Sequence, residues 1–286
     1  MIGYKAIVFD MDGTLLDGNN RLDPELVECL GVLRNRGIKL MIATGRTFGE
    51  VLDVIGDVTF DGYICSNGMT IYDDQRDQLR ARSLDTDKIY EAAVEASRRE
   101  LYYEIRHEYG SPFIMADHFK YMEEMLSVQQ PSEVSDHEWS SRKLALTDLK
   151  RVDDKHFIDY LTKDSVVKIY FFAPEKEKVD AWKMFLNQTF DLKLFSVESS
   201  SANSCEIVSG DVSKGEAVEF LMEKQEISLD EVICFGDGTN DISMFNVVNY
   251  AIAMSNAGIE VKRASDGVTS HSNEQQGVLK WLKQNI

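Results

Sequence analysis

The chain has 286 residues, of which 43% are hydrophobic and 28% are charged, a composition typical of globular proteins with a sizeable core. Its 31 basic and 49 acidic side chains give a formal net charge of −18. Such an acidic chain argues against a nucleic acid or an anionic membrane as partner, and an anionic substrate has to be attracted by local positive charge.

The four cysteines lie far apart and form no Cys-x-x-Cys pair. This spacing is typical of reduced thiols in a protein core and not of a disulfide framework or a zinc site. No basic segment followed by a long apolar one opens the sequence, and no apolar run approaches the length that spans a membrane. We therefore expect a soluble cytoplasmic protein, either a monomer or a small homo-oligomer.

The first part of the chain alternates buried strands with helices. Apolar runs without polar alternation indicate strands covered on both faces, as in a parallel sheet: 6–9, 40–43 and 63–65. Asp23 before Pro24 is typical of a helix N-terminus. Thr47 and Glu50 have the spacing of a capping box at the start of the next helix. This order predicts a βαβαβ unit.

The pattern changes near Arg82. We expect helices at 85–100, 118–127, 153–162 and 174–188, and strands at 101–109, 112–116, 166–172, 193–197 and 205–208. The polar segment 131–141 is predicted to be irregular. Because strands and helices no longer alternate strictly, we predict a separate α+β domain at 83–208, inserted into a first domain made of 1–82 and 209–286.

The βα alternation then returns. Ser213 and Glu216 have capping-box spacing, which places Lys214 in the first turn of a helix. Strands are predicted at 232–235 and 251–254, with a short helix between them. The whole fold class is therefore α/β, with a Rossmann-like, doubly wound parallel-sheet core and an inserted α+β domain.

Two carboxylates, Asp10 and Asp12, follow the first buried strand in the segment DMDGT. They repel each other and lose hydration there unless they share a cation or a proton, although Asp and Gly are also common in ordinary turns. The carboxyl ends of parallel strands meet at one sheet edge. Further polar or glycine positions follow other strands or begin the next helix: Thr44, Gly45, Lys214, Asp237, Asn240 and Asp241. The recurrence of such residues at successive strand ends favours a single functional site that contains all of them.

With these motifs the chain resembles the haloacid dehalogenase-like phosphatase superfamily, and within it the Cof-type hydrolases with a large cap between the second and third motifs. The four motifs match DMDGT, Thr44, Lys214 and the segment GDGTND at 236–241. Segments 66–68, 253–257 and 267–278 also resemble Cof-type sequence. The likeness covers the core domain throughout and the inserted domain more loosely.

The resemblance implies a Mg²⁺-dependent phosphatase of a small phosphorylated metabolite, such as a sugar phosphate or a phosphorylated cofactor. Asp10 is then the nucleophile that forms an aspartyl-phosphate, and Asp12 is the general acid and base. The implied metal ligands are Asp10, Asp237 and, through its backbone carbonyl, Asp12, with Asp241 in an outer position or acting through water.

Thr44, Gly45 and Lys214 are the expected ligands of the phosphoryl group, and Asn240 is expected to orient Lys214 or the phosphate. Arg46 and Asn67 are further substrate candidates, with pairing to an acidic residue as the alternative for Arg46. Two other functions stay open: phosphoryl transfer to another metabolite, as in mutases, and a non-catalytic phosphometabolite-binding regulator.

Overall fold

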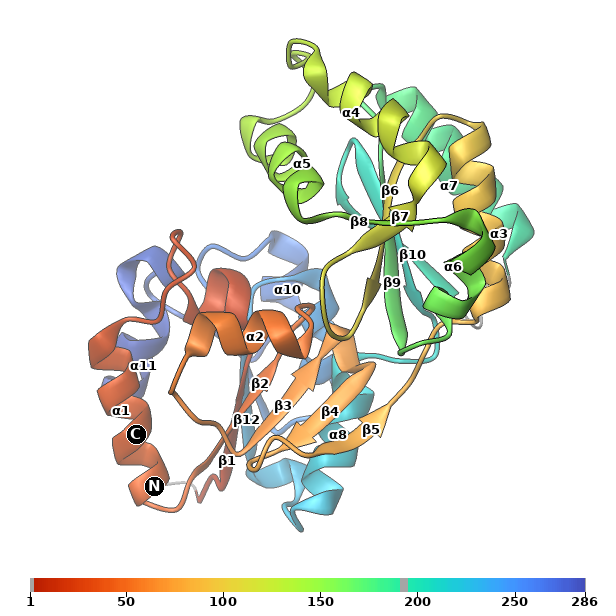
Figure 1. Cartoon of the computed structure of the whole chain (residues 1–286). Coiled ribbons are helices and arrows are strands. Elements are labelled where there is room, and N and C mark those ends of the chain that lie inside the picture. Colours follow the sequence, from red (N-terminus) through yellow and green to blue (C-terminus); the bar gives the residue numbers. More distant parts are fainter. Residues whose placement is uncertain (1–2, 191–194, 286) are drawn as a thin grey trace. The chain divides into compact units, whose positions relative to one another are not determined.

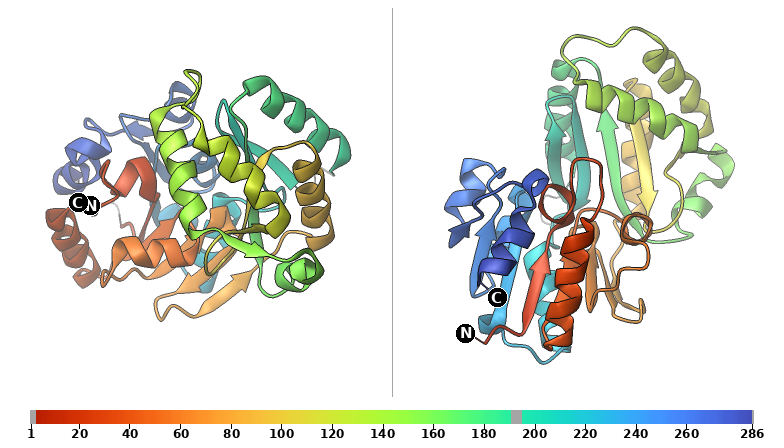
Figure 2. Two further views of the ribbon diagram at one scale, coloured as in Figure 1. Left: turned by 45° about the horizontal axis from the view of Figure 1, so that its top comes forward. Right: turned by 90° about the vertical axis from the view of Figure 1, so that its left-hand side faces the viewer.

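The computed structural model describes residues 3–190 and 195–285. By its internal contacts the chain divides into two units, which we call the core unit (Met1–Ala81 with Val212–Ile286) and the inserted unit (Arg82–Asp211). The expected boundaries lay after residues 82 and 208, and this division lies after residues 81 and 211. Each unit has its own sheet (Figure 1). Figure 2 shows that the red-to-orange and blue parts of the chain build the core unit together.

The core sheet has the strand order β14-β13-β12-β1-β2-β3-β4-β5. Neighbouring strands are parallel from β14 to β3, whereas β4 and β5 run antiparallel at the edge. The bounds are β1 Ala6–Phe9, β2 Lys39–Ala43, β3 Gly62–Cys65, β4 Thr70–Asp73, β5 Gln78–Ala81, β12 Val232–Gly236, β13 Tyr250–Ala253 and β14 Gly267–Val268. The parallel core sheet is thus confirmed, with an antiparallel hairpin-like edge that the sequence analysis did not identify.

Alternate side chains of each strand point to opposite faces of this sheet, and here the side chains on both faces are apolar. Helices therefore cover both faces. Ile7 and Phe9 of β1 pack with three helices on one face: α1 (Pro24–Asn35), α2 (Phe48–Ile55) and α11 (Gly277–Asn285). Ala6 and Val8 pack with three on the other: α8 (Lys214–Lys224), α9 (Ile242–Phe245) and α10 (Ile259–Arg263). This is the doubly wound arrangement that the buried apolar runs predicted.

The predicted helix starts have a clear local cause. The Asp23 carboxylate accepts hydrogen bonds from the backbone N–H groups of Glu25 and Leu26 and so caps α1. Thr47 and Glu50 form both halves of the capping box of α2. Ser213 caps α8 by accepting from Glu216 N, whereas the Glu216 carboxylate pairs with Arg80.

The inserted unit has a six-stranded sheet in the order β10-β11-β9-β6-β7-β8, antiparallel except between β7 and β8. Its strands are β6 Tyr102–His107, β7 Phe113–Met115, β8 Lys150–Val152, β9 Val166–Phe172, β10 Phe195–Ser201 and β11 Ser204–Ser209. Its helices are α3 Thr86–Arg98, α4 Phe119–Ser127, α5 Asp136–Asp148, α6 Asp154–Leu161 and α7 Lys176–Thr189. The α+β composition is therefore confirmed.

Some predicted elements differ from the structure. The prediction of an irregular segment at 131–141 is wrong from Asp136 onward, because Ser135 caps α5 and Trp139 buries its ring. Helix α7 begins at Lys176, two residues after Pro174. The predicted strand at 193–197 starts outside the described residues and corresponds to β10 from Phe195.

All four cysteines are free, and three of them are buried: Cys65, Cys205 and Cys234. This agrees with the expectation of reduced thiols in the core. Over residues 3–190 and 195–285, the structure has no helix that is both long and apolar enough to cross a membrane.

Candidate active site at the carboxyl ends of β1 and β12

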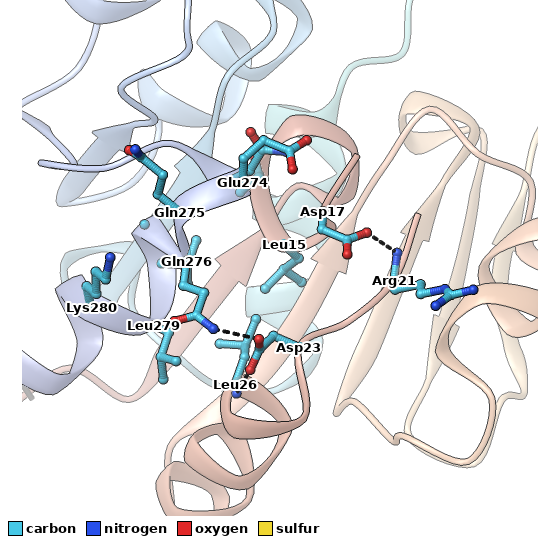
Figure 3. A pocket seen from close by; sticks show the side chains of 14 residues that line it. Leu15, Asp17, Arg21, Asp23, Leu26, Glu274, Gln275, Gln276, Leu279 and Lys280 are labelled. Carbon is cyan, nitrogen blue, oxygen red and sulfur yellow. Dashed lines mark hydrogen bonds between the residues drawn. The ribbon is translucent and has the colours of Figure 1, made fainter. Parts of the chain in front are cut away.

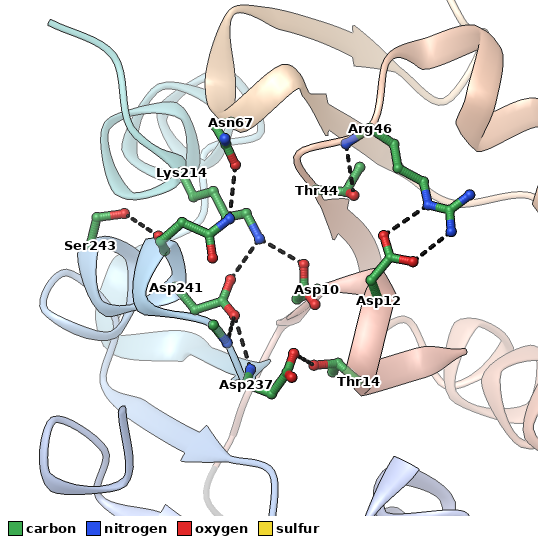
Figure 4. A network of polar contacts seen from close by, with 12 residues as sticks. Asp10, Asp12, Thr14, Thr44, Arg46, Asn67, Lys214, Asp237, Asp241 and Ser243 are labelled. Atoms are coloured by element: carbon green, nitrogen blue, oxygen red, sulfur yellow. Dashed lines mark hydrogen bonds and ion pairs between the residues drawn. The ribbon is translucent and has the colours of Figure 1, made fainter. Parts of the chain in front are cut away.

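The DMDGT segment turns sharply after β1 and approaches the loop after β12. Gly13 has φ of +73°, and a Cβ atom at this position would lie 2.3 Å from Asp237 Oδ2. Only glycine therefore fits both the left-handed backbone and the close approach. The turn brings Asp10 from one strand and Asp237 from its neighbour to the same edge of the sheet (Figure 4).

Three carboxylates, of which Asp237 is half-buried, and one buried lysine form the centre of the site. One oxygen from each of Asp10, Asp237 and Asp241 lies within 4.8 Å of the others. Lys214 Nζ donates to Asp10 Oδ1 and to Asp241 Oδ1, both at 2.6 Å, and the lysine side chain is only 1% exposed. The fold thus brings together four side chains from three separate segments, all of which were expected in one site (Figure 4).

The electrostatics of this cluster follow from burial and crowding. Burial raises the pKa of Asp10 above its ordinary value, and Lys214 offsets part of that effect. Burial acting alone would lower the pKa of Lys214, but Asp10 and Asp241 hold it above its ordinary value. Burial and then the charge of Asp241 raise the pKa of Asp237 to about 6. Three carboxylates therefore share one buried cation, and the negative charge is not fully compensated.

Asp241 has both carboxylate oxygens occupied. Oδ1 accepts from Lys214 Nζ, and Oδ2 accepts from the backbone N–H groups of Asp237 and Gly238, each at 2.9 Å. In this arrangement Asp241 fixes the lysine and the loop after β12. By contrast, Oδ2 of Asp10 accepts no hydrogen bond from the described part of the chain and is available to a ligand.

Asp12 lies apart from the buried cluster. Its side chain is 52% exposed, and its carboxylate accepts from Arg46 Nε at 2.8 Å and from Arg46 Nη2 at 2.5 Å. Arg46 Nη2 also donates to Asn20 Oδ1 at 3.0 Å. Arg46 was expected either to bind substrate or to pair with an acidic residue. In this structure it pairs with Asp12.

The expected phosphate ligands line a second side of the site. Thr44 is fully buried at the end of β2, and its Oγ1 accepts from Arg46 N at 3.1 Å. Asn240 Nδ2 donates to Asn67 Oδ1 at 3.0 Å, so Asn240 orients Asn67 here and makes no hydrogen bond to Lys214. A Cβ atom on Gly45 would lie 3.4 Å from that same Asn67 oxygen.

Two residues at the site were not assigned from the sequence. Thr14 Oγ1 donates to Asp237 Oδ1 at 3.2 Å, and Asn256 Nδ2 donates to Gly13 O at 2.9 Å and to Asp237 Oδ2 at 3.3 Å. Asn256 lies just after β13, in the segment 253–257 that carries part of the family resemblance. Its position after a parallel strand was the available signal.

A hollow of about 390 Å³ lies beside this site in the core unit (Figure 3). Thr14 lines it and also contacts Asp237, but none of Asp10, Asp12 and Lys214 is among its lining residues. Asp23 Oδ2 accepts from Gln276 Nε2 at 2.6 Å across its wall. The charged cluster of Figure 4 is therefore distinct from this hollow.

Comparison with known proteins extends over nearly the whole chain. Residues 7–282 match the model of the haloacid dehalogenase-like hydrolases. The chain is 28% identical over 287 residues to the 5-amino-6-(5-phospho-D-ribitylamino)uracil phosphatase YwtE of Bacillus subtilis, covering 98% of this chain and 97% of that protein. It is 27% identical over 288 residues to the HMP-PP phosphatase of Serratia proteamaculans, covering 98% of this chain and 94% of that protein.

The solved structures give the same fold. A haloacid dehalogenase-like hydrolase from B. subtilis superposes with a TM-score of 0.78 at 22% identity, over 99% of this chain and 100% of that one. The sheet order, the acidic segments after β1 and β12, and the family match all agree. The chain therefore belongs to the haloacid dehalogenase-like hydrolases and is one of their Cof-type phosphatases.

Proposed function

We propose that the protein is a Mg²⁺-dependent phosphatase that hydrolyses a small phosphorylated metabolite through an aspartyl-phosphate on Asp10. The observation that carries the proposal is the fully buried Lys214, held by Asp10 and Asp241 at 2.6 Å each. Taking a lysine and two carboxylates out of water is costly even when they pair, and such a preorganised cluster suits a site in which charge develops during a reaction. A phosphoryl group at Asp10 supplies such a charge.

The donor set suits a hard divalent cation. Asp10 and Asp237 present carboxylate oxygens at the ends of neighbouring strands, and burial, followed by the charge of Asp241, raises the pKa of Asp237. We propose that Asp10, Asp237 and the Asp12 carbonyl hold the ion, with Asp241 behind them. When bound, Mg²⁺ withdraws charge from the phosphoryl oxygens and offsets the carboxylates.

The first half-reaction follows from these positions. A carboxylate oxygen of Asp10 attacks phosphorus, and the bond from phosphorus to the ester oxygen breaks. Asp12, protonated, gives its proton to that leaving oxygen. Lys214, Thr44 and Gly45 stabilise the phosphoryl oxygens, the lysine by charge and the other two as donors near the end of β2. The product is an acyl phosphate on Asp10 and a free alcohol.

The second half-reaction returns the enzyme to its starting state. Asp12, now a carboxylate, accepts a proton from water, and the water oxygen attacks phosphorus. The bond between Asp10 and phosphorus breaks, and inorganic phosphate leaves. Asp12 is exposed enough to meet both the leaving group and water, which suits the two proton transfers.

The substrate class rests on the relatives. The two curated relatives named above act, by their names, on a phosphorylated ribitylamino uracil and on HMP-PP. We propose a small phosphorylated metabolite of comparable kind, a sugar phosphate or a phosphorylated cofactor. Transfer to a second metabolite and non-catalytic binding are the alternatives, and the presence of both Asp10 and Asp12 argues against the second, because binding alone needs no general acid. The free cysteines support a reducing, cytoplasmic location.

The experiment is Mg²⁺-dependent release of phosphate from p-nitrophenyl phosphate by purified protein. We expect Asp10→Asn to abolish release and Asp12→Asn to lose most turnover while keeping metal binding. Asp53→Asn, on the exposed side of α2, is the matched control and keeps full activity. Acid quenching followed by mass spectrometry should find a phosphoryl group on the peptide containing Asp10. Full activity of Asp10→Asn would exclude the covalent mechanism.

A further inference from the structure

The Glu216 carboxylate is bound at both oxygens by one arginine. Arg80 Nη1 donates to Oε1 at 2.5 Å, and Arg80 Nη2 donates to Oε2 at 2.6 Å. Glu216 lies in the first turn of α8, two residues after Lys214, and Arg80 lies on the edge strand β5. Such a bidentate ion pair fixes the relative orientation of the two side chains as well as their distance. A single contact does not fix the orientation.

The same guanidinium reaches the loop that carries Asn67. Arg80 Nη2 donates to Gly68 O at 3.2 Å. Gly68 has φ of +105°, and a Cβ atom there would lie 2.7 Å from Ser213 O, the residue that caps α8. The loop 66–68 therefore lies directly on the first turn of α8, and Arg80 is bonded to both.

Further contacts make Arg80 a fixed part of this junction. Its side chain is 14% exposed, and its Cζ atom lies 4.7 Å from the centre of the Phe220 ring on α8. Arg80 Nε is buried and has no hydrogen-bond partner within the described chain. A buried donor without a partner is destabilising. The orientation of the guanidinium therefore satisfies Nη1 and Nη2, which bind Glu216 and Gly68, and leaves Nε without a partner.

The junction carries Lys214, a proposed phosphate ligand, and lies next to Asn67, the further substrate candidate. Lys214 projects from the turn that Glu216 shares, and Asn67 precedes the carbonyl that Arg80 binds. Asn67 itself has φ of +57° and is held through its side chain by Asn240. Because α8 and the loop come from distant parts of the chain, their spacing depends on contacts such as these.

We propose that Arg80, with Glu216, is a positioning residue of the phosphate site that sets Asn67 against Lys214. This inference rests on the proposed function. Arg80→Lys keeps the positive charge but loses the bidentate contact with Glu216. The loop 66–68 and helix α8 are then no longer held at a fixed distance. We expect the KM for p-nitrophenyl phosphate and the inhibition constant of inorganic phosphate to rise about tenfold, the worth of one well-placed charged hydrogen bond.

The test uses the full chain and compares Arg80→Lys, Glu216→Gln and their double variant with the control Arg34→Lys. Arg34 pairs with Asp61 elsewhere in the core unit, so its replacement perturbs a similar ion pair away from the site. We expect the two single variants to have similar effects on phosphate inhibition and the double variant to add little. Arg34→Lys should leave the inhibition constant unchanged.

A direct readout comes from the backbone ¹H–¹⁵N signals of Asn67 and Gly68 without substrate. These signals should shift in Arg80→Lys and in Glu216→Gln, and not in Arg34→Lys. Unchanged KM, inhibition constant and Asn67 signals in a folded Arg80→Lys would overturn the inference while the Asp10-dependent activity stands. If the wild-type chain releases no phosphate, the proposed function fails, and the Asn67 signals still report whether Arg80 positions the loop.

Discussion

Arg46 binds both carboxylate oxygens of Asp12, through Nε at 2.8 Å and Nη2 at 2.5 Å. The arginine follows β2 and the aspartate follows β1, so the pair joins two neighbouring strand ends. The Arg46 backbone N–H also donates to Thr44 Oγ1. One residue therefore contacts both the proposed acid and base and a proposed phosphate ligand.

If Arg46 orients Asp12, its removal should harm proton transfer more than phosphate binding. We expect Arg46→Ala to lower kcat for an alkyl phosphate by about 10²-fold, the lower range for general acid catalysis. The kcat for p-nitrophenyl phosphate should fall less, because nitrophenolate leaves without a proton and only the activation of water by Asp12 is then affected. Arg46→Lys should lower kcat by an intermediate amount, since lysine keeps the charge but cannot form the bidentate ion pair.

The two substrates act as each other's control in this experiment. An equal loss on both, with a raised KM, would mean that Arg46 binds the phosphoryl group and does not act through Asp12. The effect on folding should be small, because an ion pair with a 52% exposed carboxylate contributes about 1 kcal/mol or less.

Asp237 should link stability to Mg²⁺ and to pH. Its pKa is raised to about 6 by burial and by Asp241, so without metal its contribution to stability is lost as pH rises through about 6. In EDTA, we expect Asp237→Asn to have a higher Tm than the wild type at pH 7.5. Millimolar Mg²⁺ should raise the Tm of the wild type, because an ion bound only by the folded state stabilises it.

Differential scanning fluorimetry with and without Mg²⁺ measures both effects. The Mg²⁺-induced shift should be absent in Asp237→Asn and intact in the surface control Asp53→Asn. A wild-type chain whose Tm does not respond to Mg²⁺ would show that these carboxylates do not form a metal site.

A buried histidine in the inserted unit should make stability depend on pH. His118 is 6% exposed, its Nε2 donates to Leu101 O at 2.7 Å, and its ring stacks on Tyr103. Burial lowers its pKa, so below about pH 6.5 the unfolded chain binds a proton that the folded chain does not. The free energy of unfolding should fall as pH drops from about 6.5 to 5.

Urea unfolding of the full chain across this pH range is the measurement. His118→Phe keeps an aromatic ring but cannot titrate, so we expect lower stability at pH 7 and a weaker decline toward pH 5. His156→Gln, at an exposed position of α6, is the matched control. The same decline in His118→Phe as in the wild type would assign it to other groups, among them His107, whose pKa burial also lowers.

Local sequence predicted the elements whose cause is local. The apolar runs of β1 and β2 need cover on both faces, and the caps at Asp23 and Thr47 satisfy N–H groups within their own turns. Helix α5 has a local cap at Ser135, which the prediction of an irregular segment did not use. It also depends on distant contacts, such as that of Arg142 with Glu104 on β6 at 2.6 Å, which its sequence does not indicate.

For the site, the sequence determined which residue types stand at the strand ends, because βα alternation brings those ends to one edge. Tertiary structure decided how each side chain is used. It engages both oxygens of Asp241, pairs Arg46 with Asp12, brings Asn256 to Asp237 and joins Glu216 to Arg80. Apart from the bonds between Asp241 and the loop after β12, these pairings link residues 19 or more positions apart in the chain. They depend on orientations and distances of a few ångströms, which spacing along the sequence does not encode.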